Sequence, residues 1–301
     1  MTQNSGKYKN SDVEAYVLMN NAYYHYNQFI KAIRSNSVSN DGKNELLNII
    51  DKYVSGDESQ RFIKTIRSRK KLYRARIINP DQLKRNLGID VFDVGGDYQT
   101  RGFDEGNSRE APLGMSREGR NNITGVSYLY LADNISTASV EIKPVCGQLV
   151  SVAEFETSKP LRVVDFSTDV MFDVEESRED NIALGTLFTL IMSRFFLPVS
   201  DTSEYLATQI ITDHIRKTGI DGIAYKSFYD MKGTNYTIFN SNRDSIHYRG
   251  SRILMHKSVN NAFVDFNDGR ILNTKSMNNK QYDKAEKNKI CSNISRQLID
   301  E

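Results

Sequence analysis

In the stretch SYLYLADNISTASVEI, residues 127–142, a strand pattern passes directly into a short helix pattern. SYLYLA alternates apolar and polar residues as a half-buried strand does. Asp133, Asn134 and Ser136 can each cap the start of a helix. The carboxylate of Glu141 then falls on the helix side expected to be buried. Buried carboxylates usually have a partner or a function, so Glu141 is the first candidate site residue.

Strand and helix patterns continue on both sides of this stretch. The helices are expected at NIALGTLFTLIMSRFF and at SEYLATQIITDHIRKTG, which ends in a glycine suited to a helix C-terminus. The strands are expected at LYRARII, QLVSVAEFE, LRVVDFS, GIAYKS and NYTIFN. This order predicts an α+β fold, a mixed β-sheet core with flanking helices.

Three regions follow from the patterns. Residues 1–70 are expected to form a small helical N-terminal region, with DESQRFIKTIRSRKK as its last helix. Residues 71–250 are expected to form the α+β domain, and residues 251–301 a basic, partly mobile C-terminal extension. The helical region is interpreted as a scaffold or interaction surface, since no acid, base and nucleophile converge in it.

Composition excludes several classes of protein. The 301 residues carry a net charge of +2, which does not favour a nucleic-acid partner or an anionic membrane. A polar N-terminus and the absence of a long apolar run argue against a signal peptide or a membrane span, so a cytoplasmic location is expected. Two distant cysteines and four scattered histidines form no disulfide or metal pattern. No serine-hydrolase elbow or phosphate-binding loop occurs.

A sparse set of polar residues remains at strand ends and in the glycine-rich segment 95–125. Arg74 lies inside a strand pattern and needs an anionic partner, either a protein carboxylate or a ligand phosphate. Tyr130 could be a packing residue or a ring that contacts a ligand. Arg120 in GRNNITG and Ser227 in GIAYKS complete the set. Each of these signals is weak alone.

Their order along the chain resembles the RES domain family. The matching pieces are LYRAR, GRNNITG, YLADNISTASVE and GIDGIAYKS followed by GTNYTIF, over roughly residues 71–248. That family is named after an Arg, a Glu and a Ser, and it contains toxins of RES-Xre toxin-antitoxin modules. The resemblance implies an ADP-ribosyltransferase-like fold, consumption of NAD+ as the substrate without a metal, and a possible antitoxin partner of the Xre-like helix-turn-helix type.

The resemblance also implies roles for particular residues. Arg74, Tyr130, Glu141 and Ser227 match the family's catalytic positions, and the residues expected to bind NAD+ are Arg74, Tyr130, Arg120, Asn122, Ser227 and Asn235. Glu141 would stabilise the cation that forms when the nicotinamide–ribose bond breaks. Arg74 would hold the pyrophosphate, Tyr130 would stack on nicotinamide, and Ser227 would bind the ribose or the acceptor.

The sequence departs from the family pattern at one position in this loop. Asn121 follows Arg120 where an aromatic residue often stands, so Asn122 is the aligned amide. The acceptor stays open between water, phosphate and a macromolecule, which separates a glycohydrolase, a phosphorylase and an ADP-ribosyltransferase. A non-catalytic nucleotide-binding or interaction module is the competing class, and the oligomeric state also stays open.

Overall fold

The computed structural model describes residues 10–34, 41–55, 62–79, 102–167, 179–199, 201–256, 262–264 and 271–273. Contacts divide the chain into two compact units, one of Met1–Pro144 with Gln148–Met255 and one of Val145–Gly147 with His256–Glu301. In the second unit, β9 (Ala262–Val264) and β10 (Ile271–Asn273) pair antiparallel. The first unit contains all of the candidate site residues.

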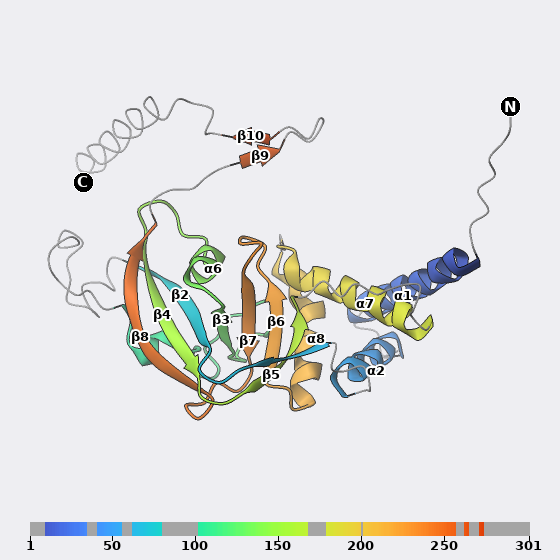
Figure 1. Ribbon diagram of the computed structural model, residues 1–301, viewed down its shortest axis with the longest axis horizontal. Helices are drawn as coiled ribbons and strands as arrows, with labels where there is room; N and C mark the ends of the chain where they lie inside the picture. Colours follow the sequence, from blue (N-terminus) through green and yellow to red (C-terminus); the bar gives the residue numbers. More distant parts are fainter. Residues whose placement is uncertain are drawn as a thin grey trace. The chain divides into compact units, whose positions relative to one another are not determined.

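An eight-stranded mixed sheet forms the centre of the first unit (Figure 1). Its strand order is β1-β5-β6-β7-β3-β2-β4-β8, and β5 with β6 is the parallel pair among antiparallel neighbours. The strands are β1 (Ile63–Ile66), β2 (Lys71–Ile78), β3 (Leu129–Ala132), β4 (Leu149–Thr157), β5 (Leu161–Phe166), β6 (Gly222–Lys226), β7 (Thr234–Ile238) and β8 (Ile246–Met255).

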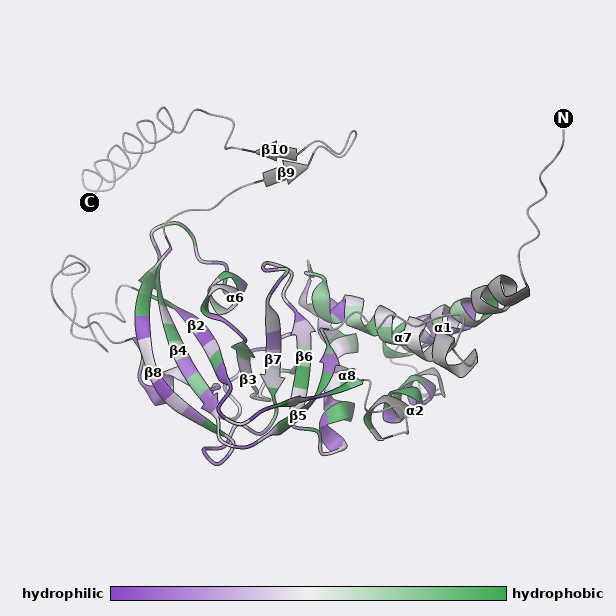
Figure 2. Ribbon diagram, viewed as in Figure 1, coloured by the Kyte–Doolittle hydropathy of each residue, from purple (hydrophilic) through white to green (hydrophobic). Residues whose placement is uncertain are grey.

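Helices pack beside this sheet, and those near the N-terminus share a core with later ones. The helices are α1 (Asn10–Arg34), α2 (Asp41–Ser55), α5 (Glu105–Ser108), α6 (Ile135–Glu141), α7 (Glu179–Phe196) and α8 (Leu206–Lys217), the last preceded by a 3-10 turn at Thr202–Tyr205. Figure 1 shows α1 running alongside α7, with α2 next to them. Figure 2 shows hydrophobic residues within α7, β5 and β6. Phe29 of α1 and Leu46 of α2 are fully buried in the same cluster as Phe188 of α7.

The pairing register divides the side chains of the sheet between two faces, because directly paired residues lie on the same face. On one face Ala75, Ala132 and Val152 pack against Ala138 of α6, and this surface is called the α6 face. The residues of β7 and β6 that continue the line of paired positions from Ala132 lie on the α6 face as well. On the opposite face Leu72 joins a buried apolar cluster with residues from all eight strands, β1 to β8. Neighbouring residues of one strand therefore serve different faces.

The structure confirms the α+β class, the mixed sheet core with flanking helices and the helical N-terminal region. The expected helix over DESQRFIKTIRSRKK is wrong, because Ile63–Ile66 is an edge strand that pairs antiparallel with β5. Tertiary pairing overrides the helical spacing of its apolar residues. The strand β8 was not predicted, and most of the extension 251–301 lies outside the described residues. The proposed domain boundaries stay a prediction.

Within the described residues, none of the helices combines the length and the apolar character that crossing a bilayer requires.

Candidate active site

The helix α6 places Glu141 over the sheet. The Asn134 side chain caps the start of α6 by accepting a hydrogen bond from the Thr137 backbone N–H at 2.9 Å. Thr137 and Ala138 are the buried residues of this helix. Glu141 is the last helical residue, and its Oε1 accepts hydrogen bonds from Ser227 Oγ and Asn235 Nδ2, both at 2.6 Å. Among the described residues none donates to Oε2. One carboxylate oxygen is therefore fixed and the other can accept a ligand hydroxyl.

Hydrogen bonds join the turn that follows β6 to the helix α6. Ser227 Oγ accepts from the Asp230 N–H at 3.0 Å, and Thr137 Oγ1 donates to Asp230 Oδ2 at 2.7 Å. At Gly233 a Cβ atom would lie 2.0 Å from Thr137 Oγ1, so only glycine allows this approach. The serine and the helix that carries Glu141 are thus held in one packed arrangement.

Glu141 lies at the wall of a cavity of about 260 Å³ on the α6 face. Strands β2, β3, β6 and β7 form its floor, and α6 forms one side. It is lined by Tyr73, Arg74, Ala75, Tyr130, Leu131, Ala132, Ala138, Glu141, Ile142, Tyr225 and Asn235. Ser227, which is fully buried, contacts the cavity through Glu141. The structure therefore brings together four of the predicted residues: Glu141, Tyr130, Asn235 and Ser227.

Tyr130 is fixed by the GRNNITG loop. Its hydroxyl donates to Asn122 Oδ1 at 2.6 Å and accepts from the Asn121 N–H at 3.2 Å, and burial raises its pKa above the usual value. The amide nitrogen of Asn122 donates to the carbonyls of Arg117 and Ile123. Asn122 thus contacts the protein with its oxygen and its nitrogen, and it affects the cavity by holding the Tyr130 ring.

Tyr225 is a cavity residue that the sequence reasoning missed. It is buried, and burial raises its pKa to about 12, so the ring is neutral at physiological pH. It pairs with Asn235 across the sheet, which places both side chains on the α6 face. The signal was present in GIAYKS, where Tyr225 stands two residues before Ser227. In a strand that spacing puts two side chains on one face.

Arg74 borders the cavity within β2, but its guanidinium is not part of this group. Ala75 faces α6, so alternation along the strand directs the Arg74 side chain to the opposite face. There Arg74 Nη1 donates to the carbonyls of Ser108 at 2.9 Å and Arg109 at 3.0 Å. Burial, with the neighbouring Arg76 cation, lowers its pKa to about 10, so Arg74 remains charged at neutral pH. A pyrophosphate contact would require the guanidinium to leave these carbonyls.

Arg120 also lies outside the residues that line the cavity. Its Nη1 donates to the Arg194 carbonyl at 2.5 Å, and its guanidinium stacks 5.4 Å from the centre of the Tyr205 ring. Its positive charge lowers the pKa of the buried Tyr225, against the larger effect of burial. Arg120 therefore contacts α7 and the turn before α8, and it affects the cavity through its positive charge.

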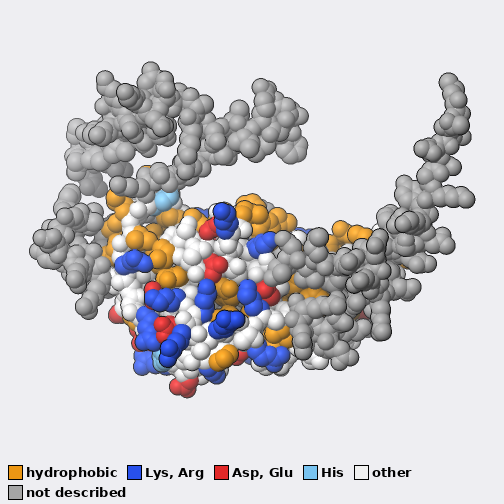
Figure 3. All heavy atoms as spheres, in the orientation of Figure 1, with side chains coloured by type: hydrophobic (Ala, Val, Ile, Leu, Met, Phe, Trp, Pro, Cys, Tyr) orange, Lys and Arg blue, Asp and Glu red, His pale blue; other side chains and the backbone are white. Residues whose placement is uncertain are grey.

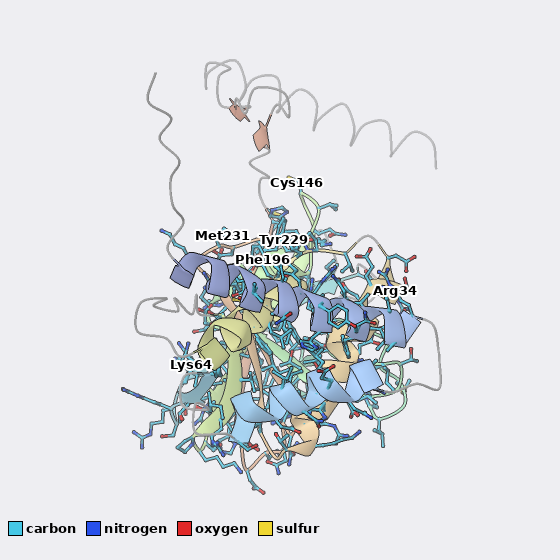
Figure 4. The ribbon with its side chains drawn as sticks, turned by 90° about the vertical axis from the view of Figure 1, so that its right-hand side faces the viewer. Arg34, Lys64, Cys146, Phe196, Tyr229 and Met231 are labelled. Atoms are coloured by element: carbon cyan, nitrogen blue, oxygen red, sulfur yellow. The ribbon has the colours of Figure 1, made fainter. Side chains whose placement is uncertain are left out.

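Exposed aromatic residues follow Ser227 at the edge of the site. Phe228 packs 5.4 Å from the Phe196 ring and 5.5 Å from the Tyr229 ring, and Lys143 Nζ lies 5.0 Å from the centre of Tyr229. Figure 4 shows Phe196 and Tyr229 near each other beside the end of α7. The segment that holds Ser227 therefore presents a hydrophobic edge to solvent.

In the part of the chain that the structure describes, no group of three or more His, Cys, Asp or Glu residues could hold a metal ion. The expectation that no metal takes part stays a prediction. The polar groups at the cavity include one carboxylate, its amide and hydroxyl donors, and the neutral tyrosines Tyr130 and Tyr225. Such a set can bind a sugar hydroxyl and stabilise positive charge.

The fold is α+β, and it holds a carboxylate over a tyrosine-lined cavity at one face of the sheet, a site of the kind that can take a small polar ligand. The model of the RES domain family matches residues 95–253, more than half of the chain. The chain therefore belongs to the RES domain family, as its motifs predicted. Glu141, Tyr130, Ser227 and Asn235 fall inside the matched range, whereas Arg74 precedes it.

A solved structure shows a distant similarity. A chain in the crystal structure of the M. tuberculosis MbcT–MbcA toxin–antitoxin complex aligns with a TM-score of 0.38 and 16% sequence identity, covering 70% of this chain and 92% of that one. No curated protein matches the sequence.

Proposed function

We propose that this protein is an NAD+-cleaving toxin or defence effector that breaks the bond between nicotinamide and ribose and so depletes NAD+. One observation carries the proposal: a carboxylate oxygen of Glu141, held by Ser227 and Asn235, at the wall of a cavity lined by Tyr130 and Tyr225. Membership of the RES family supports it. A cytoplasmic site of action is expected, because NAD+ is abundant there.

The reaction breaks the C1′–N bond of the nicotinamide ribose. The bonding electrons pass to the nicotinamide nitrogen, which becomes neutral, and positive charge develops on the ribose. Oε2 of Glu141 accepts a hydrogen bond from a ribose hydroxyl and stabilises this charge, as carboxylates do in glycosidic cleavage. Ser227 and Asn235 keep the carboxylate oriented. The neutral rings of Tyr130 and Tyr225 provide surfaces against which nicotinamide can stack.

The acceptor then attacks C1′ from the open side of the cavity. Water gives ADP-ribose and a proton, phosphate gives the 1′-phosphorylated product, and a macromolecular side chain gives an ADP-ribosylated target. None of the described residues that line the cavity favours one of these acceptors over the others. We expect the activity to need restraint in the cell, for which an antitoxin of the Xre-like helix-turn-helix type is the proposed partner.

The test is direct. The purified full chain is incubated with NAD+, and free nicotinamide, ADP-ribose and protein-linked ADP-ribose are quantified, with and without added phosphate. Release of nicotinamide supports the proposal, and the second product names the acceptor. A folded chain that releases no nicotinamide under any of these conditions overturns it and favours a non-catalytic binding module.

A further inference from the structure

The cavity beside Glu141 is small for a dinucleotide. Its volume of about 260 Å³ falls below the range of roughly 300–1,000 Å³ that is usual for sites holding a drug-sized ligand. If NAD+ is the substrate, as proposed above, this cavity can hold nicotinamide and its ribose. The diphosphate and the adenosine must then lie on an adjoining surface.

A second hollow continues from the first along the α6 face. It has a volume of about 380 Å³ and is lined by Tyr73, Val152, Glu154, Arg249, Gly250, Ser251 and Arg252. It is called the β8 groove, after the strand that contributes four of these residues. Tyr73 lines both hollows, so they meet at its side chain.

The strand register places the β8 groove on the same side of the sheet as Glu141. Tyr73 pairs with Glu154, and Val152 pairs with Arg252. Val152 packs in the cluster under α6, so Arg252 shares the α6 face with it. A ligand anchored at Glu141 can therefore reach Arg252 without crossing the sheet.

Charge in the β8 groove is uneven. Lys71 Nζ neutralises Glu154 at 2.8 Å, and Arg249 Nη2 is engaged by Glu156 at 2.7 Å. Among the described residues, Arg252 forms no ion pair or hydrogen bond through its side chain, and it is exposed. Figure 3 shows Lys and Arg side chains gathered on the side of the molecule where β8, β4 and β2 lie. An unpaired guanidinium fits a phosphate by two parallel hydrogen bonds.

A β-bulge shapes this groove. The pairing shifts between Glu154, opposite Gly250, and Phe155, opposite Tyr248, so Arg249 is the extra residue of β8. Gly250 adopts a φ of +130°, which glycine tolerates and other residues rarely do. Bulges re-aim side chains and are frequent near functional sites.

We propose that the β8 groove binds the diphosphate and adenosine end of NAD+, with Arg252 as the residue that contacts the diphosphate. Arg252 is a specificity-determining residue in this assignment, because it contacts the half of the substrate that does not react. Arg74 does not compete for the role, since its guanidinium lies on the opposite face and donates to two carbonyls.

The test compares two substrates that share the reacting half. NAD+ carries the adenylate, and nicotinamide mononucleotide lacks it. In Arg252→Glu we expect KM for NAD+ to rise about tenfold or more, as loss of a charge-assisted hydrogen bond predicts, with kcat little changed. KM for nicotinamide mononucleotide should change less than about twofold. The rise should shrink at high salt, because the contact is exposed.

Arg162→Glu is the matched control, since Arg162 is an exposed arginine in β5, away from the groove. It should leave both KM values unchanged. Equal shifts for the two substrates in Arg252→Glu, or no shift with NAD+, overturn the inference. Arg252→Gln serves the same test if the charge reversal impairs folding, which thermal unfolding reports.

A binding measurement separates this inference from the proposed reaction. ADP-ribose contains the diphosphate and adenosine without nicotinamide, and its affinity can be measured by calorimetry whether or not the chain turns over either substrate. Binding to the wild-type chain that weakens at least about fivefold in Arg252→Glu supports the groove. Unchanged ADP-ribose affinity, or no binding to the wild type, overturns it. Absence of nicotinamide release alone would count only against the proposed function.

Discussion

The Oγ of Ser227 lies 2.6 Å from Oε1 of Glu141, although 86 residues separate them in the sequence. The contact depends on two elements that pack together, the helix α6 and the turn after β6. Asn235 of β7 donates to the same oxygen. The carboxylate is therefore oriented by one group from the turn after β6 and one from β7, and changes to either group should affect the reaction in distinguishable ways.

Glu141→Gln should lower kcat for nicotinamide release by about 100-fold or more, because an amide cannot stabilise the developing cation as a carboxylate does. The substituted side chain has the same size, so the thermal unfolding midpoint should change little. Nicotinamide release and unfolding are measured on the same preparation. Wild-type kcat in this variant would show that Glu141 has no catalytic role.

Ser227→Ala removes a donor to Glu141 and the acceptor for the Asp230 N–H. Since Ser227 is fully buried, we expect a loss of about 1–3 kcal/mol in unfolding free energy together with a reduced kcat. Ser139→Ala on the same helix is the control, because its Oγ contacts only the Ile135 carbonyl among the described residues. If both variants lose kcat equally, the effect is structural and not specific to the carboxylate.

Gly233→Ala should displace the turn that carries Ser227. The added Cβ would meet Thr137 Oγ1 at 2.0 Å, so the turn or α6 must shift. We expect kcat to fall by an order of magnitude or more, since small misplacements of reacting groups are costly. Gly106→Ala is the control, because a Cβ atom added there would lie 3.7 Å from Asp104 Oδ1, an ordinary contact distance. Equal kinetics in the two variants would contradict the packing explanation.

Arg74→Lys distinguishes two roles for this arginine. If Arg74 mainly ties β2 to the carbonyls of Ser108 and Arg109, the substitution lowers unfolding free energy by about 1–3 kcal/mol. The KM values for NAD+ and nicotinamide mononucleotide should then change by the same factor. A selective rise for NAD+ would instead favour the pyrophosphate contact that the sequence suggested.

Alkaline pH should destabilise the protein through its buried tyrosines. Tyr225 has a pKa of about 12 in the folded state and about 10 when unfolded, so its contribution is complete below pH 10 and is lost as the pH rises toward 12. Tyr225→Phe should reduce the fall in unfolding free energy between pH 10 and 12. Chemical denaturation at several pH values measures it, and an identical pH slope in the variant would contradict the assignment.

The sequence predicted the parts of the site that depend on local chemistry. Asn134 was among the predicted caps of α6, and Glu141 was expected on its buried side. The face of the sheet on which the Arg74 side chain lies could not be predicted. It depends on which of the two alternating sets of side chains in β2 packs against α6. The strand β8 was not predicted because its bulge at Arg249 interrupts the alternation of apolar and polar residues by which a strand is identified in a sequence.

The match to the RES model leaves out one of the central strands of the sheet, β2. β2 lies between β3 and β4 in the sheet, yet it comes before residue 95, where the match to the RES model begins. A fragment restricted to residues 95–253 would leave β4 and β8 without a neighbour joining them to β3. The segment that matches the family model is therefore shorter than the segment that completes this sheet.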